Sequence, residues 1–345
     1  MIKYLGLLIF CTLLVSSCHK KQNSSVYNDL FFVRKNGADM PVHVSGNKTS
    51  NTFILILHGG PGDGGLKYAN HTFSNLLEKD YVLAYWDQRH QGNSHGHLNN
   101  EDIRIDVMVE DTHAVIKSLK QRYGENINLF LLGHSWGGLL GTAYLLKNDY
   151  QTEVNGWIES GGAHDFQLMN TAVLGRLKSA AIDELSKGLN TEKWQEILDY
   201  CNSIDSSNIS WEETSTLNSY AGQAEKLIDL PPRTESELSE LELSFIGANN
   251  PYLANINKAW LPEEFYTEII ESSYTNQLSK ITIPTLLLWG KYDFKVPSII
   301  GEKALENLGS EHKYLKIYEQ SGHSSMRYQP TDFVNDVKSF IDAHK

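Results

Sequence analysis

A serine between two glycines follows a short apolar run near the middle of the chain. Residues 133–137 read Gly-His-Ser-Trp-Gly, and residues 128–132 before them have the length and composition of a buried parallel strand. Residues 138–147 carry helix-forming Leu and Ala. A strand, a tight turn around a serine and a helix together make a nucleophile elbow, in which glycines leave room for a strained serine backbone. The pattern predicts that Ser135 is a nucleophile at a helix N-terminus, where N–H groups stabilise negative charge.

Apolar runs of strand length recur on both sides of this elbow. The first two are joined at Asn36-Gly37, a strong hairpin signal. Helical patterns separate most of the others, and the longest of these, residues 105–123, ends at Gly124. This alternation predicts an α/β fold with a mostly parallel eight-stranded sheet flanked by helices. The expected strands are residues 31–33, 41–44, 53–57, 81–85, 128–132, 154–159, 284–289 and 314–318, and the other expected helices are residues 70–79 and 331–344.

The alternation of strand and helix patterns stops after the expected strand at residues 154–159 and resumes at the one at residues 284–289. Residues 164–280 have helical periodicity and polar composition, with no convincing strand. We interpret this segment as a helical cap inserted after the sixth strand. The sheet domain then consists of residues 29–163 and 281–345, and 345 residues suffice for such a core with an insertion.

A serine hydroxyl needs a base to take its proton and an acid to hold that base. On a sheet of this kind the three residues follow the chain order Ser, acid, His, each after a strand. His323 lies in Ser-Gly-His-Ser after the last strand and is the predicted base. Asp293, in a glycine-led turn one strand earlier, is the predicted acid. Asp165 after the strand at residues 154–159 is the alternative.

The oxyanion of an acyl-transfer reaction needs two N–H donors. The sequence places one at Trp136, directly after Ser135, and the other at Gly60 in the loop His-Gly-Gly-Pro-Gly, residues 58–62. These steps require no cofactor. The remaining histidines have no paired spacing with carboxylates, so the sequence predicts no metal site.

The first residues predict export and lipid anchoring. A positive end precedes an apolar stretch at residues 5–15 that is too short to span a bilayer. Val-Ser-Ser-Cys at residues 15–18 resembles the lipobox of bacterial lipoproteins, which implies cleavage after residue 17 and lipidation of Cys18. Residues 18–28 then form a tether to a membrane of the bacterial cell envelope. A plain secretory signal or an uncleaved anchor is the alternative.

The composition limits which partners this chain can bind and which covalent links it can form. The net charge of −12 argues against nucleic-acid binding, which needs clustered Lys and Arg. Cys201 is the one cysteine beyond Cys18, so the mature chain can form no internal disulfide, and we expect Cys201 to be a packing residue. Oligomeric state has no signal in the sequence.

Three motifs together resemble the proline iminopeptidase branch of the α/β-hydrolase fold. They are His-Gly-Gly-Pro-Gly at residues 58–62, Trp-Asp-Gln-Arg at residues 86–89 followed by Gly92 and Ser94, and Gly-His-Ser-Trp-Gly-Gly at residues 133–138. The resemblance implies cleavage of an N-terminal residue, typically Pro, from small peptides. It also implies a cap glutamate that binds the substrate amine, and Glu212, in a Trp-Glu pair, is the residue that matches. The sequence departs from the family pattern at His90, where the family has Gly.

The sequence therefore predicts a serine hydrolase, an aminopeptidase of proline iminopeptidase type acting on small peptides through an acyl-enzyme. A carboxylic-ester hydrolase or another amidase on the same fold is one alternative, and a non-catalytic ligand-binding lipoprotein is another. We expect Asp87 and Arg89 to form a structural ion pair. Aromatic residues of the cap are candidates for lining a substrate pocket, namely Trp194, Trp211, Tyr220 and Trp260.

Overall fold

The computed structural model describes residues 25–97, 99–235, 256–257 and 261–345. The expected signal segment, Cys18 and Trp260 lie outside the described residues. Within them, no helix is long and apolar enough to cross a membrane.

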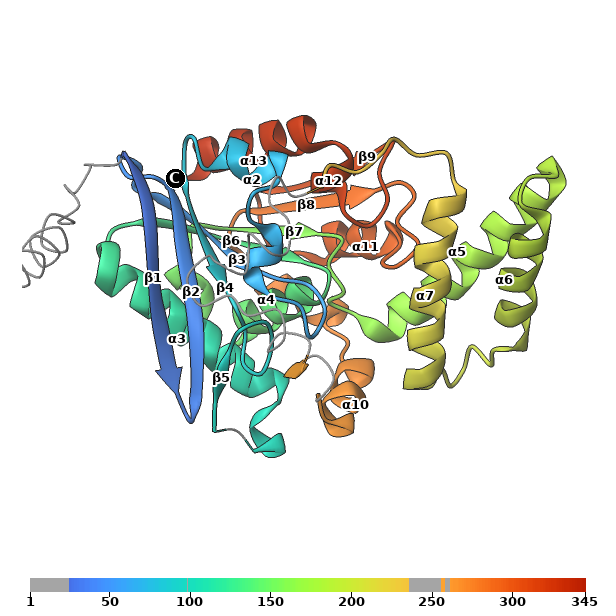
Figure 1. Cartoon of the computed structure of the whole chain (residues 1–345), viewed down its shortest axis with the longest axis horizontal. Helices are drawn as coiled ribbons and strands as arrows, with labels where there is room; N and C mark the ends of the chain where they lie inside the picture. The colour runs from blue at the N-terminus through green and yellow to red at the C-terminus, as the bar shows by residue number, and fades with distance from the viewer. Residues whose placement is uncertain (1–24, 98, 236–255, 258–260) are drawn as a thin grey trace, which may run out of the picture.

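The chain begins its sheet with a long hairpin (Figure 1). Strand β1 (Val26–Lys35) pairs antiparallel with β2 (Ala38–Asn47). The two residues between them, Asn36 and Gly37, have φ of 47° and 81°, and a type I′ turn requires positive φ at both positions. The predicted hairpin is confirmed. The tether predicted at residues 18–28 ends earlier than expected, because residues 26–28 already belong to β1.

The sheet has the predicted eight strands in the order β1-β2-β4-β3-β6-β7-β8-β9, and a two-residue strand, β5, pairs with β2 beside this path. β1, β2 and β4 pair antiparallel, and every pair from β4 to β9 is parallel. The sequence missed β5 because both of its residues are exposed and carry no apolar pattern. The remaining bounds are β3 (Thr52–Leu57), β4 (Val82–Trp86), β5 (His95–Gly96), β6 (Asn128–His134), β7 (Gly156–Ser160), β8 (Thr285–Gly290) and β9 (Lys313–Tyr318).

Helices cover both faces of the sheet, which explains why its central strands are buried on both sides. One apolar cluster joins α3 (Ile105–Tyr123) and α4 (Trp136–Leu146) to the sheet, and a second joins α2 (Thr72–Leu77) and α13 (Pro330–His344). As predicted, α3 ends at Gly124, whose φ is 129°. The other core helices are α11 (Ile299–Asn307), α12 (Ser325–Tyr328) and the 3₁₀ turns η1 (Gly65–Tyr68), η2 (Asn100–Asp102), η3 (Tyr150–Glu153) and η4 (Thr275–Lys280).

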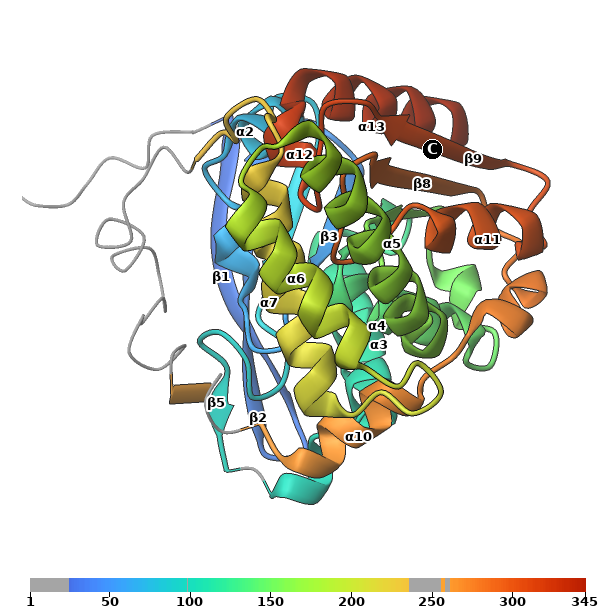
Figure 2. The same cartoon turned by 90° about the vertical axis from the view of Figure 1, so that its right-hand side faces the viewer.

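The cap is helical and enters the chain between β7 and β8, after the sixth of the eight predicted strands. It contains α5 (Phe166–Lys187), α6 (Thr191–Ser203), α7 (Trp211–Leu227) and α10 (Glu263–Glu271). Figure 2 shows α5, α6 and α7 stacked over the sheet domain. Buried residues of these helices belong to the same apolar cluster as α3 and α4, so the cap and the sheet share one core. Cys201 on α6 is fully buried in the apolar core that the cap shares with the sheet, as expected of a packing residue.

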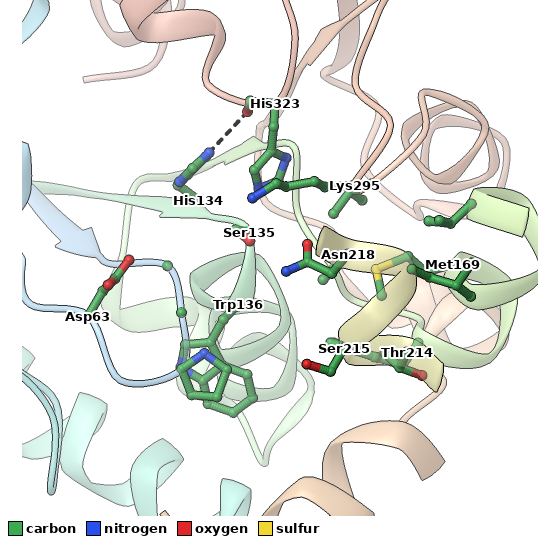
Figure 3. A pocket seen from close by; sticks show the side chains of 18 of the residues that line it. Asp63, His134, Ser135, Trp136, Met169, Thr214, Ser215, Asn218, Lys295 and His323 are labelled. Carbon is green, nitrogen blue, oxygen red and sulfur yellow. Dashed lines mark hydrogen bonds between the residues drawn. The ribbon is translucent and has the colours of Figure 1, made fainter. Parts of the chain in front are cut away.

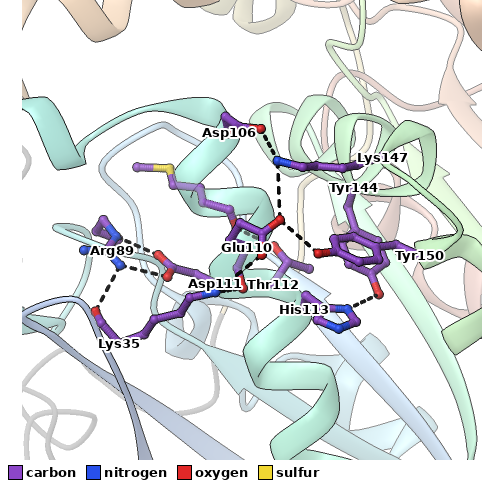
Figure 4. A network of polar contacts seen from close by, with 11 residues as sticks. Lys35, Arg89, Asp106, Glu110, Asp111, Thr112, His113, Tyr144, Lys147 and Tyr150 are labelled. Atoms are coloured by element: carbon purple, nitrogen blue, oxygen red, sulfur yellow. Dashed lines mark hydrogen bonds and ion pairs between the residues drawn. The ribbon is translucent and has the colours of Figure 1, made fainter.

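A buried ion pair fixes the loop after β4, although it differs from the expected one. Arg89 does not pair with Asp87. Its guanidinium donates two hydrogen bonds to Asp111 of α3, at 2.7 and 2.8 Å, and further ones to the hairpin carbonyls of Lys35 and Asn36 (Figure 4). Asp87 instead accepts the backbone N–H groups of Gly65, at the start of η1, and of Asn93, in its own loop after β4. Both side chains are structural, with separate partners.

Replacing Arg89 with Met should lower the free energy of unfolding by about 3–5 kcal/mol, because the Asp111 carboxylate is left buried without its cation. Lys303→Met is the matched control. Its partner Glu306 is solvent-exposed, so less than about 1 kcal/mol should be lost. Urea unfolding measures both values. Equal losses in the two variants would contradict the importance of the buried pair.

Candidate active site

The elbow forms where the sequence places it. β6 ends at His134, Ser135 has φ 57° and ψ −120°, and α4 begins at Trp136. A Cβ at Gly137 would lie 1.9 Å from the Leu57 carbonyl oxygen, and one at Gly133 would lie 2.4 Å from the Gly137 carbonyl oxygen. These contacts are impossible for any side chain, so the glycines let the turn close against β3. The Ser135 backbone is held further by hydrogen bonds to Ser160 and Ala163.

Asp293 and His323 meet beside this serine. Asp293 lies three residues after β8 and His323 five residues after β9, and the imidazole Nδ1 donates to Asp293 Oδ2 over 2.8 Å. With Nδ1 carrying the proton, Nε2 is the free nitrogen that can accept one. Asp293 Oδ1 accepts the backbone N–H groups of Lys295 and Val296. The alternative acid, Asp165, is instead the N-cap of α5, where it accepts the N–H of Leu168.

Burial shapes the protonation of this pair. It lowers the pKa of His323, and the positive charge of Lys295 lowers it further, so the imidazole is neutral and able to act as a base at neutral pH. Burial raises the pKa of Asp293, while the two backbone N–H groups act in the opposite direction. Their hydrogen bonds, together with that from His323, favour the carboxylate form.

Ser135 and His323 share one cavity of about 430 Å³ (Figure 3). It lies between the carboxyl ends of the strands and the cap, where ligands of open α/β sheets bind. Figure 3 shows Ser135 near the centre, with Trp136 below it and His323 and Lys295 above. Its lining residues include, from the sheet domain, Gly59, Gly60, Asp63, Tyr68, His134, Trp136, Lys295 and Val296, and from the cap Phe166, Met169, Asn170, Val173, Trp211, Thr214, Ser215, Leu217, Asn218 and Tyr266.

Both predicted oxyanion donors lie in this cavity. Trp136 is the first residue of α4, so its N–H has no acceptor within the helix. The direction of the Gly60 N–H is set by His58, whose Nδ1 bonds the Gly59 carbonyl oxygen at 2.8 Å. His58 Nε2 accepts the N–H of Gln88, so Nδ1 carries the proton. Because the C=O and N–H of a trans peptide point in opposite directions, fixing the Gly59 carbonyl also fixes the Gly60 N–H.

A relay of hydrogen bonds connects the oxyanion loop to the histidine loop. The Gly59 N–H donates to the Tyr68 hydroxyl at 2.9 Å, and this hydroxyl lies 2.8 Å from His134 Nδ1. His134 Nε2 lies 3.1 Å from the His323 carbonyl oxygen, which can only accept, so Nε2 carries the proton and Nδ1 accepts from Tyr68. Burial and the neighbouring His323 lower the pKa of His134 to about 3, which keeps this neutral tautomer in place.

Sequence reasoning missed Glu225, a buried glutamate of α7. Its Oε1 accepts the backbone N–H of His323 at 3.0 Å, so the cap holds the histidine loop directly. Burial, and next the charge of Asp293, raise the pKa of Glu225 to about 7. A signal was present in the sequence: with Thr214, Leu217, Ala221 and Ala224, Glu225 forms the buried stripe of α7, and an acid on such a stripe is unusual.

Other predicted residues lie away from the cavity. Glu212 is exposed on α7 and does not line it, although the adjacent Trp211 does. Trp194 is buried in the cap core and Tyr220 donates to Glu196, so neither lines it. His90 takes the left-handed conformation with φ 54°, which suits the glycine of the family pattern, and it is also absent from the lining.

Comparisons with known proteins agree with this geometry. A profile of the family described as serine aminopeptidase, S33, matches residues 48–210. The chain is 29% identical to a proline iminopeptidase of Saccharolobus solfataricus, with 86% of each chain covered, and 22% identical to a probable aminopeptidase, YbaC, of Bacillus subtilis, with 87% of this chain and 92% of that protein covered.

Solved structures show the same architecture. A proline iminopeptidase of Mycobacterium smegmatis matches with a TM-score of 0.66 and 17% identity, over 92% of this chain and 98% of that one. An esterase of Exiguobacterium antarcticum matches with a TM-score of 0.59 and 19% identity, over 92% and 100%. The chain has the α/β-hydrolase fold, as the sequence predicts.

The raised pKa of Glu225 should make stability pH-dependent. The folded state binds this proton more tightly than the unfolded chain, whose Glu pKa is 4.5. The stabilisation is therefore complete below pH 4.5 and is lost as pH rises through about 7. Glu225→Gln has no such proton to lose. Between pH 4 and pH 8, the free energy of unfolding of this variant should therefore rise by roughly 2–3 kcal/mol relative to that of wild type.

Urea unfolding of both proteins across this range measures the difference, and the titration of groups that do not interact with Glu225 cancels because both proteins contain them. Glu212→Gln, an exposed glutamate on the same helix, is the matched control and should show a much smaller pH-dependent change. A difference between Glu225→Gln and wild type that does not vary with pH would contradict the assignment.

Proposed function

We propose that this chain, a serine hydrolase of the α/β-hydrolase fold, is an aminopeptidase of proline iminopeptidase type that releases an N-terminal residue from small peptides. The observation that carries the proposal is the pairing of His323 with Asp293 at the cavity that also contains Ser135. Similarity to proline iminopeptidases over most of the chain supports the substrate class.

In the proposed mechanism, Ser135 attacks the carbonyl carbon of the first peptide bond while His323 Nε2 takes the hydroxyl proton. Asp293 holds the imidazole tautomer and stabilises the imidazolium. The N–H groups of Gly60 and Trp136 bind the oxyanion. His323 then protonates the leaving amine, and water, activated by the same imidazole, hydrolyses the acyl-enzyme to release the N-terminal residue and restore Ser135.

The cap side of the cavity suits a small apolar residue. Trp211 and Tyr266 stack at 4.2 Å between ring centroids, and Phe166, Met169 and Val173 of α5 add apolar surface beside them. Flat aromatic and branched walls of this kind bind a compact ring or alkyl group well. They favour Pro or a similar residue at the substrate N-terminus.

Ser135→Ala should lower kcat/KM by roughly 10⁴- to 10⁶-fold on Pro and Ala arylamides, because the proposed acyl-enzyme forms on the Ser135 hydroxyl. The control is Ser219→Ala, an exposed serine on α7 outside the cavity lining, which should retain wild-type activity. A fluorogenic panel of aminoacyl arylamides run beside short acyl esters measures both. Hydrolysis of esters without any of the free-amine substrates would identify an esterase instead.

We also propose that the protein is anchored in the bacterial cell envelope through a lipidated Cys18. The supporting pattern is a positive end, an apolar stretch and Val-Ser-Ser-Cys at residues 15–18, followed by a polar tether. Anchoring would keep the catalytic domain at a membrane surface.

Cys18→Ala should move the protein from the membrane fraction to the soluble fraction of expressing cells, because the acyl chains supply the membrane affinity. Cys11→Ala, within the expected signal, should leave the protein with the membranes. Fractionation and mass spectrometry of the mature N-terminus measure the outcome. Membrane retention of the Cys18 variant would contradict lipid anchoring.

A further inference from the structure

A lysine lies inside the cavity beside the candidate base. Lys295 follows Asp293 by two residues, and its backbone N–H donates to Asp293 Oδ1, which fixes its place in the loop after β8. The side chain is half-buried and lines the cavity with Ser135 and His323. Figure 3 shows it next to His323, above Ser135.

The Lys295 ammonium forms no hydrogen bond or ion pair with any residue that the structure describes. The nearby carboxylates are engaged elsewhere: Asp293 by His323 and two backbone N–H groups, and Glu225 by the N–H of His323. Among the described lining residues the one acidic side chain is Asp63, whose carboxylate is 2.6 Å from Lys67. The cavity therefore presents a cation that a ligand can pair with.

The position of this cation relative to the reacting groups identifies the part of the substrate that it faces. Figure 3 shows Lys295 next to His323, on the histidine side of the cavity, and its positive charge lowers the pKa of both His323 and His134. Trp136, a predicted oxyanion donor, lies on the other side of Ser135 (Figure 3). Since the imidazole must hand its proton to the leaving amine, Lys295 is on the leaving-group side.

We propose that Lys295 binds the α-carboxylate of the leaving residue, which directs the enzyme to dipeptides with a free C-terminus. The inference rests on the proposed aminopeptidase function and adds its substrate class. In a dipeptide the leaving nitrogen and the free carboxylate belong to one residue, so the carboxylate lies within about 3–4 Å of the nitrogen. A lysine beside the proton donor is placed for that spacing, and an ammonium–carboxylate pair in a partly desolvated cavity is a strong, charge-assisted contact.

The test compares dipeptides Pro-Xaa and Ala-Xaa with the same dipeptides carrying a C-terminal amide. Wild type should show kcat/KM at least about tenfold higher for the free acid than for the amide. Lys295→Met should reduce this ratio about tenfold, and Lys295→Arg, which keeps the charge, should retain most of the preference. The readout is the change in this acid-to-amide ratio from one variant to another. The intrinsic reactivities of the two leaving groups are the same for every variant, and any effect of the substitution on His323 applies to both substrates, so neither alters the comparison.

Rates are taken on the plateau of each variant's pH profile, because removing Lys295 also shifts the pKa of His323. An acid-to-amide ratio that is the same in wild type and Lys295→Met would overturn the role of Lys295 while leaving the aminopeptidase function standing. Hydrolysis of neither peptide form, with Ser135-dependent hydrolysis of acyl esters, would overturn both.

Discussion

The left-handed backbone of Ser135 is the constraint on which the site depends. A serine with φ 57° is strained, and the surrounding structure must hold it there. Two glycines allow β6 to turn directly into α4 while α4 packs against β3, with no space for a Cβ at either position. The same turn presents the hydroxyl at the end of the sheet and places the first N–H groups of α4 beside it. The parallel sheet then brings the loops after β3, β8 and β9 to the same edge.

Buried polar contacts tie those loops to one another. His58 fixes the orientation of the Gly59–Gly60 peptide in the oxyanion loop. Hydrogen bonds through Tyr68 and His134 connect this loop to the carbonyl of His323. Glu225 holds the N–H of the same histidine from the cap. Each bond is formed where water is largely excluded, so losing one leaves a buried polar group unsatisfied. Displacement of one loop is therefore resisted by the others.

The sequence was most informative where the chemistry is local. The elbow, the Asn36-Gly37 hairpin and the end of α3 at Gly124 each depend on a few neighbouring residues with restricted backbone conformations, and all were predicted. Asp293 was preferred over Asp165 by its place in the strand order, and the hydrogen bond to His323 agrees with that choice. Long-range partners were not accessible in this way. Arg89 pairs with Asp111, 22 residues away on α3, and the adjacent Asp87 offered a plausible but wrong partner.

The functional residues of the cap were also hard to predict from the sequence, because their roles depend on which way each side chain faces. Glu212 was selected by its neighbour Trp211, yet one residue changes direction by about 100° around a helix, and only Trp211 faces the cavity. Glu225 was overlooked because its role depends on what α7 packs against. The result is a cavity in which Asp63 and Lys295 lie on opposite sides of Ser135 (Figure 3). Although the whole chain carries a net charge of −12, the cavity wall beside His323 presents the cation Lys295. Because short-range charges dominate inside a partly desolvated site, this local cation, more than the overall charge, governs which peptide ends the site accepts.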